Sequence, residues 1–229
     1  MVTTLFVANT HTQLLFFTTD GMAYKLKTWR LPSGGRTARG KAIVNILPIP
    51  TGVSIAAIMP VDRDEAEWND LQIVFATSKG SVRRNRLSDF TNVKSNGKIA
   101  MKFEGEEEGV RLINARICSE DDDVMLVTNS GRAIRFPVPD VRVFNSRAST
   151  GVRGVKLNNG DEVVSMSIIR HFEAESDERA SYLKMRRAMA GLADDAEVSE
   201  DEEGNANSPL SPERYAEMSA AENLILTIT

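Results

Sequence analysis

Hydrophobic and polar positions along residues 1–170 follow a pattern that occurs three times. Each repeat opens with a short apolar run, passes through a glycine turn, alternates apolar with polar residues, and closes with a second apolar run. The opening runs are residues 5–10, 72–77 and 124–129, the turns lie at Gly21, Gly80 and Gly131, and the closing runs are residues 53–61, 110–118 and 163–169. Such runs and alternating segments predict β-strands, and glycine supplies the positive φ of a tight turn.

A second glycine marks the same place in each repeat. Gly40, Gly97 and Gly154 are 57 residues apart, each in a basic setting. Four strands in about 50 to 60 residues, repeated in tandem, predict an all-β fold of β-propeller or β-pinwheel blades. The expected blades cover about 3–61, 70–118 and 123–169, and residues 223–229 resemble the first strand of a further blade. Neighbouring blades must cover one another, because a single blade exposes apolar faces.

Residues 171–222 interrupt this pattern with a polar, acidic insertion. Residues 176–192 have Tyr182, Met185 and Met189 at helical spacing, which predicts one helix. Ser211 followed by Pro212 is a start signal for a second short helix. The acidic run between them, residues 194–203, has the composition of a disordered segment.

Composition excludes several classes of protein. The chain has 229 residues and a net charge of −4, with a single cysteine, Cys118, and two histidines. One cysteine forms neither an internal disulfide nor a zinc site, which fits a reducing compartment. We interpret Cys118 as a small buried hydrophobe, His11 as a turn residue, and the carboxylate clusters at 106–108 and 120–123 as solvated loops rather than cation sites. The sequence contains neither an apolar run of about 18 residues nor a secretory signal.

Positive charge is concentrated in one part of every repeat. Residues 1–170 carry 23 Lys and Arg against 18 Asp and Glu, whereas residues 171–229 carry 5 against 14. The windows 21–41, 80–102 and 131–156 hold six basic residues each and only two acids, Asp89 and Asp140. These candidate DNA-binding residues are Lys25, Lys27, Arg30, Arg36, Arg39, Lys41, Arg83, Arg84, Arg86, Lys94, Lys98, Lys102, Arg132, Arg135, Arg142, Arg147, Arg153 and Lys156.

The register of these residues suggests a continuous surface. Lys25, Arg84 and Arg135 each lie four positions after the turn glycine, and Lys27 and Arg86 lie two positions further on. Residues two apart on a strand share a face, so we expect a basic belt that neutralises the phosphates of a curved duplex. Binding of this kind is largely independent of base sequence. We expect reversal of Lys25, Arg84 and Arg135 to glutamate to abolish DNA binding and leave the fold intact.

Two other interpretations of the charge pattern stay open. Basic residues on outer strands also keep sheet edges soluble and unpaired. A protein-interaction propeller would use the same basic rim to bind an acidic partner. The insertion at 171–222 is either a solvated connection between blades or an acidic segment that competes with DNA for the basic body.

Several motifs resemble the C-terminal domain of the DNA gyrase A subunit, notably residues 6–11, 36–45 and 150–155. The resemblance covers residues 1–170 and resumes at 223–229. It implies a six-bladed β-pinwheel that wraps duplex DNA around a basic rim, in the bacterial cytoplasm at the nucleoid. It also implies partners: the remainder of the gyrase A subunit and the gyrase B subunit in an A2B2 complex, which uses ATP hydrolysis to introduce negative supercoils. The C-terminal domain of the topoisomerase IV A subunit is the alternative within the same class.

The chain departs from that family in two ways. The family's first blade carries a Gln-Arg-Arg-Gly-Gly-Lys-Gly box, and the nearest match here, Ser33-Gly34-Gly35-Arg36, lies in what would be the second blade. We therefore expect a fragment without the first and the later blades. The breakage–reunion region with its catalytic tyrosine and the ATP-binding segment are also absent, so we expect no catalysis by this chain, no metal site, and no cofactor of its own. ATP and Mg would act in the holoenzyme through other regions.

Overall fold

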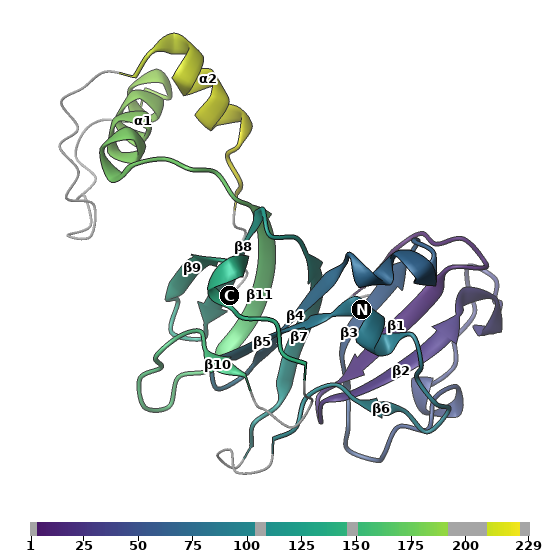
Figure 1. The fold of residues 1–229 in the computed structure, drawn as a ribbon. Coiled ribbons are helices and arrows are strands. Elements are labelled where there is room, and N and C mark those ends of the chain that lie inside the picture. Colours follow the sequence, from purple (N-terminus) through teal and green to yellow (C-terminus); the bar gives the residue numbers. More distant parts are fainter. Residues whose placement is uncertain (1–3, 104–108, 146–150, 192–209, 225–229) are drawn as a thin grey trace. The chain divides into compact units, whose positions relative to one another are not determined.

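Antiparallel strands build the first of two units into which the chain divides, and two helices build the second (Figure 1). The units are Met1–Ile169 and Arg170–Thr229, and each is described by itself. The computed structural model describes residues 4–103, 109–145, 151–191 and 210–224. The expected acidic run at 194–203 and the end of the expected strand at 223–229 therefore lie outside the described residues.

Three antiparallel sheets make up the first unit. The first sheet has the order β3 (Ile55–Val61), β1 (Gln13–Thr18), β2 (Met22–Lys27), β6 (Lys98–Ile99). The second has the order β10 (Val152–Arg153), β5 (Ser81–Arg86), β4 (Gln72–Thr77), β7 (Leu112–Cys118). The third has β11 (Val163–Arg170), β8 (Asp122–Thr128) and β9 (Ala133–Pro137). Short 3-10 turns follow β2, β5 and β9, namely Thr28–Arg30, Leu87–Phe90 and Val138–Asp140, and two more are Ile43–Asn45 and Glu65–Asn69.

Each of the later two repeats supplies an outer strand to the sheet of the repeat before it. β6 belongs to the second repeat by sequence but pairs with β2 of the first, with Met22 opposite Ile99 and Ala23 opposite Lys98. β10 belongs to the third repeat and pairs with β5 of the second, with Val152 opposite Val82. Each four-stranded sheet is therefore completed by the following repeat, and the sheets do not coincide with the blade boundaries expected from the sequence.

The three hairpin turns share a residue spacing and a hydrogen bond, which show where each repeat starts. The first strand of every hairpin ends in a threonine three positions before the turn glycine: Thr18, Thr77 and Thr128. In each turn the glycine N–H donates to the carbonyl of that threonine, at 2.9 to 3.0 Å. The opening strand expected at residues 5–10 was placed wrongly, because the strand before Gly21 is β1, and Leu5 and Val7 are 89% and 95% exposed.

Two turn glycines also hold the next repeat in place. The carbonyl of Gly21 accepts hydrogen bonds from the N–H groups of Ala100 and Met101, at 2.9 and 3.1 Å. The carbonyl of Gly80 likewise accepts from Gly154 and Val155, at 2.8 and 3.3 Å. Both glycines have a φ of +81°, and a Cβ at Gly21 would lie 2.3 Å from the Met101 carbonyl oxygen. Positive φ and this close approach both require glycine.

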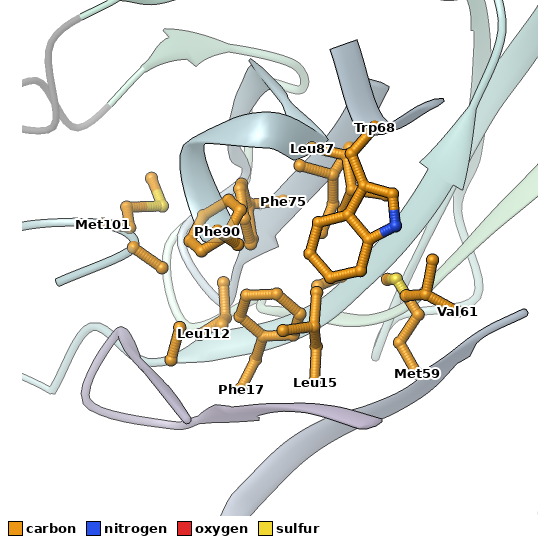
Figure 2. Packing of buried hydrophobic residues seen from close by; sticks show 14 residues of the cluster. Leu15, Phe17, Met59, Val61, Trp68, Phe75, Leu87, Phe90, Met101 and Leu112 are labelled. Atoms are coloured by element: carbon orange, nitrogen blue, oxygen red, sulfur yellow. The ribbon is translucent and has the colours of Figure 1, made fainter. Parts of the chain in front are cut away.

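The core between the first two sheets is rich in aromatic residues (Figure 2). Phe17 from the first sheet meets Phe75 and Phe90 of the second repeat edge to face, with ring centroids 5.2 and 5.5 Å apart. Trp68 is fully buried beside them and donates its indole N–H to the Arg63 carbonyl at 3.1 Å. Edge-to-face pairs stabilise packing beyond the area that they bury, so this cluster fixes the two sheets against each other.

Two further clusters cover the remaining sheet faces. Val74, Val82 and Leu126 lie in the cluster between the second and third sheets. The other face of the first sheet packs under residues 43–53, where Leu47 and Ile49 are buried. Both faces of the first two sheets are therefore covered, which explains why the central strands β1 and β4 read as continuous apolar runs.

The second unit contains α1 (Ser176–Met189) and α2 (Pro212–Ala220). Glu175 and Glu178 form a capping box at the start of α1, and the Ser211 hydroxyl accepts from the Arg214 N–H at the start of α2. The Arg214 guanidinium joins the helices, because it binds both Glu178 carboxylate oxygens at 2.9 Å and the Glu173 carbonyl at 2.9 Å. Within the described ranges, no helix has the length and apolar character to cross a membrane.

Substitution of Gly80 tests the contact between repeats. Gly80→Ala places a Cβ 2.7 Å from a Val155 methyl group, whereas Gly160→Ala meets nothing within 4 Å at the same φ of +81°. Both substitutions carry the cost of the left-handed conformation, and overpacking adds about 1 to 3 kcal/mol for Gly80 alone. Denaturant unfolding followed by circular dichroism measures the difference. Equal losses in the two variants would contradict the proposed role of the close approach.

Arg214→Ala tests the helical pair. Hydrogen bonds from Arg214 lower the pKa of Glu178, so the stabilisation is present above the ordinary value of 4.5 and is lost as the pH falls through the lowered value. We expect amide hydrogen exchange in α2 to accelerate in Arg214→Ala at neutral pH and in the unsubstituted chain in acid. Arg179→Ala is the control, because Arg179 is exposed on α1. Unchanged protection in Arg214→Ala would show that the helices are held by other contacts.

Candidate nucleic-acid interface

The eighteen basic residues singled out by sequence are not equally accessible. Twelve are exposed: Lys27, Arg30, Arg36, Arg39, Lys41, Arg86, Lys94, Arg132, Arg135, Arg142, Arg153 and Lys156. Lys25, Lys98 and Lys102 are half-buried, and Arg83 and Arg84 are buried. Arg147 lies outside the described residues.

The two edges of the interlocked sheets differ in charge. β6 and β10 form one edge of the first and second sheets, and Lys94, Lys98, Arg153 and Lys156 lie on or next to these strands. β3 and β7 form the opposite edges and contact each other. The segments that follow β3 and β7 contain nine carboxylates: Asp62, Asp64, Glu65, Glu67, Asp70, Glu120, Asp121, Asp122 and Asp123. Four of these carboxylates form ion pairs, and the others make these segments less attractive to a polyanion than the β6 and β10 edge.

Lys25 joins two repeats from inside the fold. Its ammonium group donates to the Glu65 carboxylate at 2.8 Å and to the Thr91 carbonyl, and it lies 5.7 Å from the centre of the Trp68 ring. All three partners follow the first hairpin in the chain and belong to the contact with the second sheet. With 16% of its side chain exposed, Lys25 is held by the protein itself.

Arg84 occupies the same register position one repeat later and is also buried. Its side chain is 7% exposed and lies 3.9 Å from the Glu120 carboxylate. Its Nε and Nη1 atoms have no hydrogen-bond partner among the described residues. The backbone carbonyl of Arg84 accepts from the N–H of Phe144 at 2.7 Å, so a segment of the third repeat runs alongside. The neighbouring Arg83 donates from Nε to Asn85 at 2.8 Å and stacks on the Phe144 ring.

The burial of Lys25 and Arg84 contradicts the expected basic belt. Residues four positions after the turn glycine face the following repeat, so Lys25 and Arg84 lie inside the fold rather than on an exposed rim. Arg135, the third member, is 43% exposed and pairs with Asp123 at 3.4 Å. Reversing Lys25 and Arg84 would place carboxylates in the contacts between repeats, so the expectation of an intact fold does not agree with the structure.

Lys27 is exposed but has an acidic neighbourhood. It lines an open hollow with His11, Asp62, Asp64 and Glu65. Its counterpart Arg86 is the last residue of β5 and pairs with Gln72 on β4. Gln72 also pairs with Cys118 on β7, and Cys118 directly precedes the acidic segment at 119–123. The carboxylates weaken the local attraction for phosphate, and the exposed residues near the outer strands are better placed to bind it.

Sequence reasoning did not single out Trp29, an exposed aromatic residue in the first basic window. Trp29 is 56% exposed, and the Arg30 guanidinium lies 5.3 Å from the centre of its ring. The pair offers an apolar surface beside a cation in the 3-10 turn after β2. A tryptophan directly before an arginine in a polar turn was the available signal, and counting charges alone misses it.

The single cysteine and the three tyrosines take part in packing and internal hydrogen bonds. Burial raises the pKa of the Cys118 thiol to about 12, against the opposing effect of Arg84. Tyr24 is buried and donates its hydroxyl proton to the Pro48 carbonyl at 3.3 Å, and Tyr182 and Tyr215 stack in the helical unit. The expected carboxylate cluster at 106–108 lies outside the described residues. Among the residues that the structure describes, no three His, Cys, Asp or Glu side chains gather as a metal site.

Comparisons with known proteins agree with this architecture. The family model for the DNA gyrase C-terminal domain, a beta-propeller, matches residues 12–62, 72–119 and 122–170. The DNA gyrase A subunit of Granulibacter bethesdensis is 48% identical over 240 residues, which cover 100% of this chain and 25% of the relative. The protein of the same name from Rickettsia bellii is 39% identical, with the same coverage. For the one from Escherichia coli the match is 38% identical over 166 residues, or 72% of this chain and 18% of that protein.

Solved structures share the fold. The C-terminal domain of DNA topoisomerase IV aligns with a TM-score of 0.61 at 23% identity, over 72% of this chain and 49% of that one. The DNA gyrase A C-terminal domain aligns with a TM-score of 0.56 at 23% identity, over 71% of this chain and 49% of that one. The predicted all-β, propeller-like fold is confirmed.

The chain spans about a quarter of the length of these gyrase relatives from Granulibacter and Rickettsia. The three segments of the family match coincide with the three hairpin repeats and together cover more than half of the sequence. The resemblance seen in the sequence is therefore confirmed, and this chain belongs to the DNA gyrase C-terminal domain family of β-propellers.

Proposed function

We propose that this chain is a DNA-binding part of the gyrase A subunit that holds the backbone of duplex DNA along the β6 and β10 edge. The main support for this proposal is the difference in charge between the two edges of the sheets. The exposed residues Lys94, Arg153 and Lys156 lie on or next to the outer strands, and the residues that follow β3 and β7 include nine carboxylates. Phosphates neutralised at that edge release counterions, which provides the free energy of binding.

The proposed contact reads the DNA backbone rather than the bases. The exposed cations come from turns and short edge strands, without an element shaped to enter the major groove in the described part of the β-unit. Contacts of this type position a duplex without reading its sequence, and preferences then arise from the bending stiffness of the DNA. Repeats that follow one another around an arc would guide the duplex along a curve.

In the whole protein, this contact would serve the strand-passage reaction. A duplex wrapped in one direction presents a crossing of fixed hand, and ATP hydrolysis by other regions of the complex converts that crossing into negative supercoils. The partners would be the rest of the gyrase A subunit and the gyrase B subunit in an A2B2 complex, in the bacterial cytoplasm. The chain itself would contribute no catalytic group, and ATP and Mg would bind elsewhere.

The relatives favour gyrase over topoisomerase IV. Relatives matched over the whole chain are A subunits of DNA gyrase, at 48% and 39% identity. The topoisomerase IV domain is similar at 23% identity, which speaks for the fold alone. Gyrase is therefore our proposal for the parent enzyme.

Charge reversal at the outer edge tests the proposal. Lys94→Glu with Arg153→Glu changes two exposed residues, one beside β6 and one on β10. We expect the slope of log affinity against log salt for a duplex to become shallower by about 2, since each phosphate contact contributes roughly 0.9. Fluorescence anisotropy with a labelled duplex measures it. The matched control is Arg63→Glu with Arg116→Glu, two exposed residues outside the basic windows.

Equal slopes in the two double variants would remove the outer edge as the DNA surface. A folded chain that shows no salt-dependent duplex binding at all would reject the function and favour an acidic protein as the partner of the basic edge.

The buried register residues give a contrasting expectation. Lys25→Glu places a second carboxylate beside Glu65, and Arg84→Glu buries an anion near Glu120. A carboxylate at either position would be largely removed from water and would lie beside another carboxylate, so each variant should unfold at lower denaturant concentration than the unsubstituted chain. Denaturant unfolding measures this, with Arg39→Glu as the exposed control. Full stability of the Lys25 and Arg84 variants would contradict their role between repeats.

A further inference from the structure

α1 has two faces of different character. Arg179, Leu183 and Arg187 recur every four residues and so form one stripe along the helix. The opposite side contains Ser181 and Tyr182, which are buried. Arg179 is exposed, and Leu183 and Arg187 are half-buried. Lys184 lies next to the stripe and is exposed, so the face of α1 that points away from the helix contacts is basic.

Residues 171–229 are acidic overall, so their net charge does not reveal the basic face of α1. Arg214 binds the carboxylates of Glu178 and Glu217, at 2.9 and 3.1 Å. Glu222 accepts from the Tyr182 hydroxyl at 2.8 Å and pairs with Arg186 at 2.8 Å. These three carboxylates are therefore engaged by residues of the same helical pair.

The basic stripe is not engaged in the same way. Arg179, Lys184 and Arg187 form no ion pair with any residue in the described ranges. Among the described residues, no carboxylate therefore neutralises their positive charge.

The helical pair holds this face rigidly. The two helices are joined near their starts by Arg214, whose guanidinium also lies 5.0 Å from the Phe172 ring centre. Further along, the Tyr182 and Tyr215 rings pack with centroids 5.1 Å apart. Figure 1 shows α1 and α2 packed beside each other. A fixed helix loses less conformational entropy when it binds a ligand, so the basic stripe is prearranged.

We propose that the stripe of Arg179, Lys184 and Arg187 is a second surface for the phosphates of duplex DNA, separate from the β6 and β10 edge. The proposal rests on the proposed function of the β-unit. Guanidinium groups bind phosphate oxygens bidentately, and ammonium groups bind them as point charges. Three cations on one side of a straight helix fit a regular row of phosphates, and they provide no means of reading bases.

The surface is expected in close relatives of this chain rather than in the whole family. The family match ends at residue 170, before α1. The Granulibacter and Rickettsia relatives match the chain over its entire length, whereas the match to the Escherichia coli protein covers 72% of it. The helical pair would therefore add DNA contacts that the shared β-unit does not contain.

The test uses the full chain and a labelled duplex of arbitrary sequence. Arg179→Glu with Arg187→Glu should make the slope of log affinity against log salt shallower by roughly 2. Arg63→Glu with Arg116→Glu, which changes the net charge equally, should leave the slope unchanged. Arg179→Lys with Arg187→Lys should retain the slope, because the charge is kept. Circular dichroism of all variants checks that the helices are intact.

Two results would overturn the proposal, and they differ in meaning. A slope unchanged in the α1 glutamate variant but reduced in Lys94→Glu with Arg153→Glu would leave the β-unit as the DNA surface and assign the stripe to an acidic partner other than DNA. An unsubstituted chain without salt-dependent binding would reject the stripe and the proposed function together.

Discussion

Interlocking of consecutive repeats is the constraint on which the β-unit depends. A sheet of this size exposes apolar faces and unpaired edges, and here the following repeat covers both. β6 completes the first sheet, β10 completes the second, and the carbonyls of Gly21 and Gly80 hold the segments that come after these strands. The described basic residues on or next to β6 and β10, namely Lys94, Lys98, Arg153 and Lys156, therefore lie close to backbone that the preceding repeat holds by hydrogen bonds.

The interlocking of repeats also determines which charged side chains are buried and which a ligand can reach. On β2, Lys25 and Lys27 point to the same side, yet Lys25 lies under the next repeat and Lys27 beyond it. A buried cation needs partners, and Lys25 has the Glu65 carboxylate and the Thr91 carbonyl. The strand register therefore decides which face a residue occupies, and the extent of the neighbouring repeat decides whether a ligand reaches it.

The sequence predicted the repeated hairpins, the turn glycines and the gathering of cations, because these depend on local pattern and composition. It misplaced the first strand, since residues 5–10 are as apolar as residues 13–18, and only the spacing from Thr18 to Gly21 distinguishes them. It did not predict the pairing of β6 and β10, which are two residues long and join the sheet of the preceding repeat. Nor did it identify Arg84 as buried, because a strand with two consecutive arginines has the composition of a solvent-facing one.

The helical unit shows how placement can reverse an inference from composition. Fourteen acids against five bases in residues 171–229 suggest repulsion of DNA. Arg214 binds two of these carboxylates, and Arg186 with Tyr182 binds a third. An ion pair cancels much of the field of each partner beyond about a Debye length, roughly 10 Å at 0.1 M salt, so Arg179, Lys184 and Arg187, which form no ion pair within the described ranges, add positive potential close to that face. A phosphate that approaches α1 from this side meets local attraction although the net charge of the segment is negative.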